Sequence, residues 1–197
     1  CFKLNHNALI VDQRASGESE GNTISFGINE HKDCLKWIDF AVNHFGDDVK
    51  IIITGISMGA ATVMNATQYD LPKNVVGVLA DCGYDSAKNI IKKTIKEMHL
   101  PPSIMYPFVK LGARIFGGFN VDETSPIEAI KKCKLPIIFI HGDADDFVPC
   151  YMSKNVYEVC TSTKRLVFIN NAGHGIAYLV DSKKYLDEIE DFFNYTK

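Results

Sequence analysis

Residues 53–60 read Ile53-Thr54-Gly55-Ile56-Ser57-Met58-Gly59-Ala60, so a serine stands midway between two glycines. A β-branched run precedes this stretch, and small residues with helical character follow it. A serine on a tight turn from a strand into a helix projects its hydroxyl above the sheet, and glycines two residues away admit the close approach of neighbouring backbone. The stretch therefore predicts a nucleophile elbow, with Ser57 as the nucleophile and the Met58 amide as an oxyanion donor at the helix N-terminus.

Outward from this stretch, short apolar runs alternate with helical patterns. Continuous apolar runs suit strands that are covered on both faces, as in a parallel sheet. Between them, apolar residues recur at helical spacing. This alternation predicts a doubly wound α/β fold with a mostly parallel sheet. The predicted strands are Ala8–Val11, Lys50–Thr54, Val75–Ala80, Pro136–Ile140 and Arg165–Ile169, and the predicted helices are Leu35–Phe45, Ala60–Gln68, Tyr151–Cys160 and Tyr185–Phe193.

One connection is long for a compact domain. About 50 residues separate Cys82 from Lys134 without a convincing strand. We expect a helical cap insertion over about residues 83–134, above the carboxyl ends of the strands, where ligands bind in open α/β sheets. An ordinary crossover with one extra packed helix is the alternative. The insertion contains four lysines at helical spacing, a Pro-Pro break, and an apolar piece (Lys88, Lys92, Lys93 and Lys96; Pro101 and Pro102; Phe108, Leu111, Ile115 and Phe116).

The composition excludes several classes of protein. With 46% hydrophobic and 23% charged residues over 197 positions, the chain suits one globular domain and not a disordered or collagen-like chain. Its net charge of −3 argues against a nucleic-acid partner. No apolar run reaches the roughly 18 residues of a membrane span, and no signal peptide is evident. The six cysteines form no C-x-x-C pair and show no zinc-ligand spacing, which indicates reduced thiols and a cytoplasmic location. They are Cys1, Cys34, Cys82, Cys133, Cys150 and Cys160.

A serine hydroxyl becomes a nucleophile only when a base removes its proton, and the base needs an acid to orient it. His174 is the candidate base, because it lies between two glycines after the last predicted strand, where it has no helix or strand role. The other histidines considered are expected to be solvated on polar helical faces (His31, His44 and His99) or structural at a strand end (His141).

The candidate acid lies in residues 141–149, which read His-Gly-Asp-Ala-Asp-Asp-Phe-Val-Pro and offer three carboxylates in four residues. They follow another predicted strand, so the chain order is serine, acid, histidine. The same cluster, Asp143–Asp146, could instead bind a divalent cation, for example in a metal-dependent phosphatase. It lacks the regular alternation and central glycine of a calcium loop.

Together, these motifs resemble those of the α/β-hydrolase superfamily, and especially its branch of abhydrolase-domain and serine-aminopeptidase-like enzymes, which also contains esterases. Residues 11–19 resemble that branch's D-x-R-x-x-G-x-S loop, residues 141–149 its H-G-x-x-D-x-x-V-P motif, and residues 172–175 its histidine turn. The resemblance covers nearly the whole chain. It implies that Asp145, and neither Asp143 nor Asp146, is the acid of a triad with Ser57 and His174, and that no metal or organic cofactor takes part.

The N-terminal part of the chain departs from the family pattern. Family members have three strands before the D-x-R loop, and the loop after the third supplies a second oxyanion donor. The third strand would lie between Ala8–Val11 and Lys50–Thr54, and nothing here corresponds to it. The resemblance therefore implies a single, N-terminally incomplete α/β-hydrolase domain over residues 1–197, from a longer protein. A hydrophobic N-terminal anchor is frequent in that branch, which implies a membrane-attached parent.

The expected activity is that of a serine hydrolase acting on a small-molecule ester or related acyl substrate. A peptidase or a thioesterase would use the same three residues, so both remain alternatives. A catalytically silent fragment that binds ligands is a further alternative, because one oxyanion donor has no counterpart. The sequence does not indicate an oligomeric state.

Overall fold

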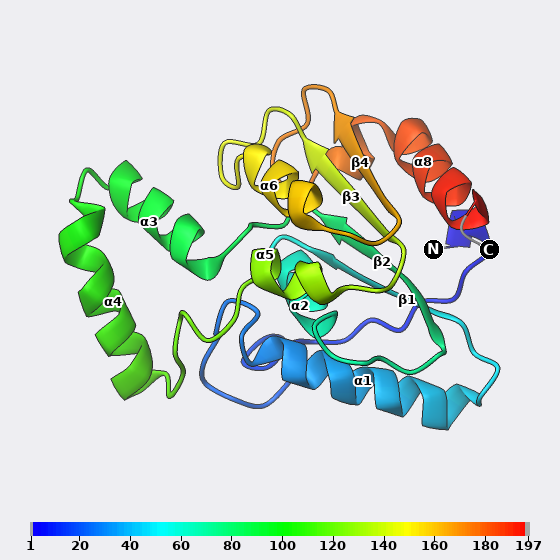
Figure 1. Ribbon diagram of the computed structural model, residues 1–197, viewed down its shortest axis with the longest axis horizontal. Helices are drawn as coiled ribbons and strands as arrows, with labels where there is room; N and C mark the ends of the chain where they lie inside the picture. The colour runs from blue at the N-terminus through cyan, green and yellow to red at the C-terminus, as the bar shows by residue number, and fades with distance from the viewer. Residues whose placement is uncertain (1, 196–197) are drawn as a thin grey trace.

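The computed structural model describes residues 2–195, so the first of the six cysteines, Cys1, lies outside the described part. These residues form a parallel sheet with helices on both of its faces (Figure 1). The strand order is β1-β2-β3-β4, with every neighbouring pair parallel. The strands are β1 (Ile51–Ile56), β2 (Val75–Asp81), β3 (Ile137–Gly142) and β4 (Lys164–Ile169). This arrangement confirms the predicted α/β fold class and four of the five predicted strands.

The helices are numbered in chain order, and the four predicted ones are present with shifted ends. No helix within residues 2–195 is long and apolar enough to cross a membrane. The α-helices are α1 (Glu30–Phe45), α2 (Met58–Ala66), α3 (Ala87–Glu97), α4 (Pro102–Phe116), α5 (Pro126–Ala129), α6 (Tyr151–Val159), α7 (Ala177–Val180) and α8 (Ser182–Tyr195), and the 3₁₀ turns are η1 (Phe2–Leu4) and η2 (Ile130–Lys132).

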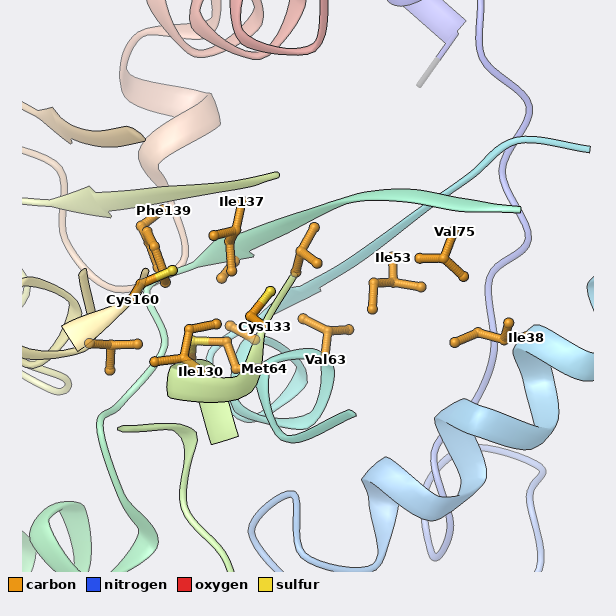
Figure 2. Close-up of a cluster of buried hydrophobic side chains, with 14 residues drawn as sticks. Ile38, Ile53, Val63, Met64, Val75, Ile130, Cys133, Ile137, Phe139 and Cys160 are labelled. Carbon is orange, nitrogen blue, oxygen red and sulfur yellow. The ribbon is translucent and has the colours of Figure 1, made fainter. Parts of the chain in front are cut away.

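The sheet buries apolar side chains on both faces. Successive side chains of a strand point to opposite faces. In β3, Ile137 and Phe139 accordingly pack on the side of α2 and α6, and Ile138 and Ile140 pack on the side of α8. Figure 2 shows the first of these clusters, which includes Met64 of α2. Strands buried on both faces explain the continuous apolar runs, and they make the doubly wound prediction correct.

The strand predicted over Ala8–Val11 is wrong. These residues have no regular structure, and the side chain of Ile10 is 89% exposed. A strand is stable only when a neighbouring strand satisfies its backbone hydrogen bonds. Among the described residues β1 pairs with β2 alone, so the apolar run at Ala8–Val11 has no strand to join. An apolar run without a partner therefore stays irregular.

The long connection between β2 and β3 is helical, as predicted, and contains α3, α4, α5 and η2. Helices α3 and α4 pack on each other through a cluster that includes Ile91, Ile95 and Tyr106 and that also contains Ile28 from the loop before α1. Figure 1 shows the pair extending away from the sheet on the side where β2 ends, with α4 outermost. The insertion is therefore anchored next to the carboxyl ends of the strands.

Candidate active site

Ser57 occupies the predicted strained turn between β1 and α2. Its φ of 55° and ψ of −114° lie in a region of backbone conformation that residues other than glycine rarely adopt. Its backbone N–H donates to the carbonyl oxygen of Asp81 at 2.8 Å, which ties the turn to the end of β2. Met58 is the first residue of α2, where backbone N–H groups have no carbonyl within the helix to bind. The turn thus presents a hydroxyl and a helix N-terminus side by side.

The two glycines that flank Ser57 play different roles. A Cβ at Gly55 would lie 2.2 Å from the carbonyl carbon of Gly59, a distance that neighbouring atoms do not tolerate. A Cβ at Gly59 would meet only the side chain of Gln13, at an ordinary 3.9 Å. The expectation that both glycines serve close backbone approach is therefore correct for Gly55 and wrong for Gly59.

This difference predicts a contrast between two alanine variants. Gly55→Ala is expected to lower the free energy of unfolding by about 3 kcal/mol or more, because backbone atoms of the elbow must move apart. Gly59→Ala is expected to change it by less than about 1 kcal/mol, because alanine favours the helix in whose first turn Gly59 lies. Denaturant unfolding of both variants measures the contrast. Equal destabilisation by the two substitutions would contradict this account of the elbow.

The structure brings Ser57, Asp145 and His174 together from three segments of the chain. The Nε2 atom of His174 lies 2.9 Å from the Ser57 Oγ, and its Nδ1 atom lies 2.7 Å from the Asp145 Oδ2. A carboxylate accepts hydrogen bonds only, so Nδ1 carries the proton and Nε2 is free to accept the serine proton. This arrangement can generate a serine nucleophile with His174 as its base.

Asp145 is held by four donors and is only 5% exposed. Its Oδ1 atom accepts from the backbone N–H groups of Phe147 at 3.0 Å and Val148 at 2.8 Å. Its Oδ2 atom accepts from His174 and faces the Nε2 atom of His141 at 3.2 Å. The other two acids of the loop, at positions 143 and 146, are exposed. Only the buried carboxylate of Asp145 therefore faces the base.

His141, predicted to be structural at a strand end, is a further component of the site. It is fully buried, and its Nε2 atom lies 2.8 Å from the carbonyl oxygen of Val148. A carbonyl only accepts, so Nε2 carries the proton and Nδ1 accepts from the Ser153 hydroxyl at 2.6 Å. Burial lowers the pKa of His141, which keeps the ring neutral. His141 therefore braces Asp145 from the side opposite to His174.

Replacing His141 tests this bracing. His141→Phe is expected to lower the free energy of unfolding by about 3 kcal/mol, because buried polar groups of Val148, Asp145 and Ser153 lose a partner. His141→Gln can keep one hydrogen bond and is expected to lose less free energy of unfolding.

The lowered pKa of His141 means that protonation of its ring favours the unfolded chain. The wild type is therefore expected to lose stability as pH falls below 6.5, and the Gln variant lacks this component. Thermal unfolding between pH 5 and pH 8 measures both effects, with exposed His44→Phe as the control.

The acid loop and the histidine loop are joined by their backbones. Ala144 N–H donates to the Ala172 carbonyl oxygen at 3.1 Å, and Asn171 N–H donates to the Asp143 carboxylate at 2.6 Å. A Cβ at Gly142 would lie only 2.1 Å from the Ala172 oxygen, so the two loops touch where β3 ends. The positions of Asp145 and His174 are therefore set together.

Two residues at the end of β2, Asp81 and the following Cys82, border the site, although the sequence did not predict a site role for either. Burial raises the pKa of the Asp81 carboxyl, which accepts a hydrogen bond from the Tyr185 hydroxyl at 2.9 Å. Burial also raises the pKa of the Cys82 thiol to about 12. The sequence signal that could have identified them is their position, since Asp81 and Cys82 directly follow the apolar run of β2.

Cys82 also bears on metal binding. Within residues 2–195, the one set of three ligand-type side chains close enough to share an ion is Cys82, Asp145 and His174, within 4.8 Å of one another. A metal site needs a thiolate, whereas the raised pKa favours the protonated thiol. Asp145 and His174 also hold each other by a direct hydrogen bond. This set therefore fits a metal poorly.

Another expectation, that His31 is solvated, is wrong. His31 is buried, with its Nδ1 atom 3.1 Å from the Gly27 carbonyl oxygen and its Nε2 atom 3.2 Å from the Tyr69 hydroxyl. The loop before α1 folds onto α2, where Asn65 binds the same carbonyl, and so encloses the ring. Burial lowers the pKa of His31. His44 and His99 are exposed, as predicted.

Comparison with known proteins gives this site a family context. A model of the prolyl oligopeptidase family matches residues 23–196. The protein YqkD of Bacillus subtilis is 28% identical over 192 residues, covering 97% of this chain and 63% of YqkD. Protein bem46 of Schizosaccharomyces pombe is 24% identical over 164 residues, covering 82% of this chain and 49% of bem46. The chain thus spans less than two thirds of the length of these relatives.

Solved structures share the fold. The Pyrococcus furiosus esterase Pf2001 has a TM-score of 0.70 at 20% identity, covering 98% of this chain and 72% of the esterase. The acylaminoacyl peptidase of Pyrococcus horikoshii has a TM-score of 0.59 at 16% identity, covering 87% of this chain and 29% of the peptidase. At these identities the likeness concerns the fold alone.

Proposed function

Because this chain belongs to the prolyl oligopeptidase family, within the α/β-hydrolase superfamily, we propose that it is a serine hydrolase that cleaves carboxylic esters or related acyl bonds. The observation that carries the proposal is the pair of hydrogen bonds, 2.9 Å and 2.7 Å long, that joins Ser57 to His174 and His174 to Asp145. These lengths are within the range that proton transfer between nucleophile and base requires.

In the first half of the reaction, the Ser57 Oγ attacks the carbonyl carbon of the substrate, and His174 Nε2 takes the hydroxyl proton. Asp145 stabilises the resulting imidazolium and keeps the ring in position. The tetrahedral intermediate then collapses as His174 gives its proton to the leaving alcohol. The product of this half is an acyl-enzyme on Ser57.

In the second half, His174 removes a proton from water, and the hydroxide attacks the acyl carbon. Collapse of the second intermediate returns the proton to Ser57 and releases the carboxylic acid. The Met58 N–H and the N-terminal end of α2 stabilise the oxyanion in both halves, each donor being worth about 3 kcal/mol of barrier. No metal or organic cofactor takes part in this sequence.

Cleavage of a peptide bond is the second candidate function. The family description and the likeness to the acylaminoacyl peptidase favour it, because the same three groups can attack an amide. Steady-state kinetics on matched ester, thioester and amide substrates with the same acyl group separates these activities. Because esters are intrinsically more reactive, the discriminating result is turnover of the amide: measurable amide cleavage supports the peptidase, and ester cleavage without amide cleavage supports the ester proposal.

Labelling with a fluorophosphonate probe tests the proposal before any substrate is known. Such a probe phosphonylates a serine that a neighbouring base has activated. The expected result is one adduct, located on Ser57 by peptide mass spectrometry and absent from the Ser57→Ala variant. A folded protein that shows no adduct at Ser57 would support the alternative of a catalytically silent, ligand-binding hydrolase fold.

A further inference from the structure

Helix α4 exposes a continuous apolar stripe (Ile104, Phe108, Leu111 and Ile115). These residues follow at intervals of four, three and four, so they lie along one side of the helix. Each exposes more than half of its surface, and the next residue, Phe116, is 87% exposed. Soluble domains rarely leave such a row of large apolar side chains uncovered, and rows of this kind mark interaction surfaces.

The stripe is not part of the core that holds the insertion together. The opposite side of α4 supplies Tyr106, which is buried, and the half-buried Met105, Val109 and Ala113 to the cluster shared with α3. Helix α4 is therefore apolar on two sides, and only one of them packs against the protein. Packing within the described residues leaves the apolar stripe unexplained.

A concentration of positive charge borders the stripe. Together, α3 and α4 contain five lysines, one arginine and one glutamate, a formal charge of +5, whereas the whole chain carries −3 and its remainder −8. Lys88, Lys92 and Lys110 line an open depression between the two helices, beside Pro107 of α4. Lys110 is paired with Asp122, whereas Lys88 is exposed. The depression is thus a cationic surface next to an apolar one.

A second apolar patch provides a contrast within the same molecule. Helix α1 exposes Trp37, Phe40 and Phe45. Helix α1 itself contains three acids and two lysines, and the exposed acids Asp47 and Asp48 follow it, so this patch has no excess of positive charge. Of these two exposed apolar patches, the one on α4 is therefore the one that is combined with an excess of positive charge.

We propose that the apolar stripe of α4 and the lysines beside it dock the protein on the surface of an anionic lipid bilayer. An amphipathic helix binds in this way when its apolar side chains enter the boundary between headgroups and acyl chains. Lysines and arginines at that depth are attracted by anionic headgroups. A negatively charged remainder favours one orientation, with the insertion facing the membrane and the rest of the protein away from it.

Co-sedimentation with lipid vesicles tests the proposal. The purified protein is expected to bind vesicles of phosphatidylcholine with about 30% phosphatidylserine at least about ten times more strongly than vesicles of phosphatidylcholine alone. Raising the salt to about 0.5 M is expected to weaken this preference, because it screens the attraction between charges. Binding that persists in part at high salt reports the apolar contribution.

Variants assign the binding to the two components of the surface. The triple variant Phe108→Ser, Leu111→Ser and Ile115→Ser is expected to retain less than about a tenth of the binding. The double variant Lys88→Gln and Lys92→Gln is expected to lose about 25-fold on the anionic vesicles, roughly five-fold per lysine. The matched controls are a triple apolar variant and a double lysine variant at exposed positions elsewhere (Ile10→Ser, Phe40→Ser and Phe45→Ser; Lys36→Gln and Lys73→Gln).

All the substituted side chains are at least partly exposed, so thermal unfolding is expected to show that the variants keep the fold. The proposal is wrong if the wild type does not bind anionic vesicles, or if the control variants weaken binding as much as the stripe variants. Sedimentation velocity separates a further outcome. If the wild type self-associates but does not bind vesicles, and the stripe variant is monomeric, the stripe mediates contact between two copies and the membrane proposal is overturned.

Discussion

Replacing Ser57 with alanine is expected to lower kcat for ester hydrolysis by about 10⁴- to 10⁶-fold. The variant lacks the oxygen that forms the acyl-enzyme, while the remaining residues still bind and orient the substrate. Residual activity then reflects attack by water. Alanine has the same Cβ as serine and adds no strain at the φ of 55°, so the variant is expected to keep the backbone and to fold.

Steady-state assays measure the loss of kcat, and thermal unfolding of the same preparations measures whether the variant keeps the fold. Ser162→Ala, at a half-buried serine remote in sequence from the elbow, is the matched control and is expected to keep full activity. A Ser57→Ala variant that retained more than about a hundredth of the wild-type kcat would show that the hydrolysis does not pass through this serine.

Asp145→Asn is expected to lower kcat by about 10³- to 10⁴-fold. The amide oxygen can still accept the N–H groups of Phe147 and Val148, but its NH₂ group then faces two histidine donors. His174 must turn or change its tautomer, and the imidazolium loses its counter-charge. We also expect a loss of stability of about 1–3 kcal/mol, since buried donors are left unpaired.

The neighbouring acids provide the controls for this variant. Asp146→Asn alters an exposed carboxylate in the same loop, and Asp143→Asn keeps a side-chain oxygen that can accept the Asn171 N–H, so both are expected to change kcat by less than about three-fold. Steady-state kinetics with circular dichroism separates lost chemistry from lost folding. A comparable decrease in all three variants, or a larger one for Asp146→Asn, would assign the acid to a different carboxylate.

Local patterns in the sequence were sufficient to predict most of the fold. The strands that lie inside the sheet are continuous apolar runs, and the helices show their own spacing, because each signal is carried by residues close together in the chain. The elbow was recognisable for the same reason, since Gly55 and Ser57 belong to one turn. The separation of Asp145 from its acidic neighbours came instead from a family resemblance.

Local sequence patterns could not predict the properties that depend on contacts between residues distant in the chain. Ala8–Val11 looks like a strand but has no partner strand, and partners belong to tertiary structure. His31 lies on a polar face of its helix until the preceding loop covers it. The roles of His141 and Asp81 likewise depend on segments that fold next to them, such as the Val148 carbonyl and Tyr185.

The backbone bonds between the acid loop and the histidine loop have a mechanical consequence. The segments around Asp145 and His174 are bonded to each other directly, whereas Ser57 is bonded to the end of β2 through Asp81, and β2 in turn pairs with β3, which leads into the acid loop. The direct side-chain link between the elbow and these two loops is the 2.9 Å contact between the serine oxygen and the imidazole nitrogen. Distant substitutions that shift the elbow relative to the two loops should therefore change turnover through this contact, while the bonds between the loops preserve the orientation of the histidine by its carboxylate.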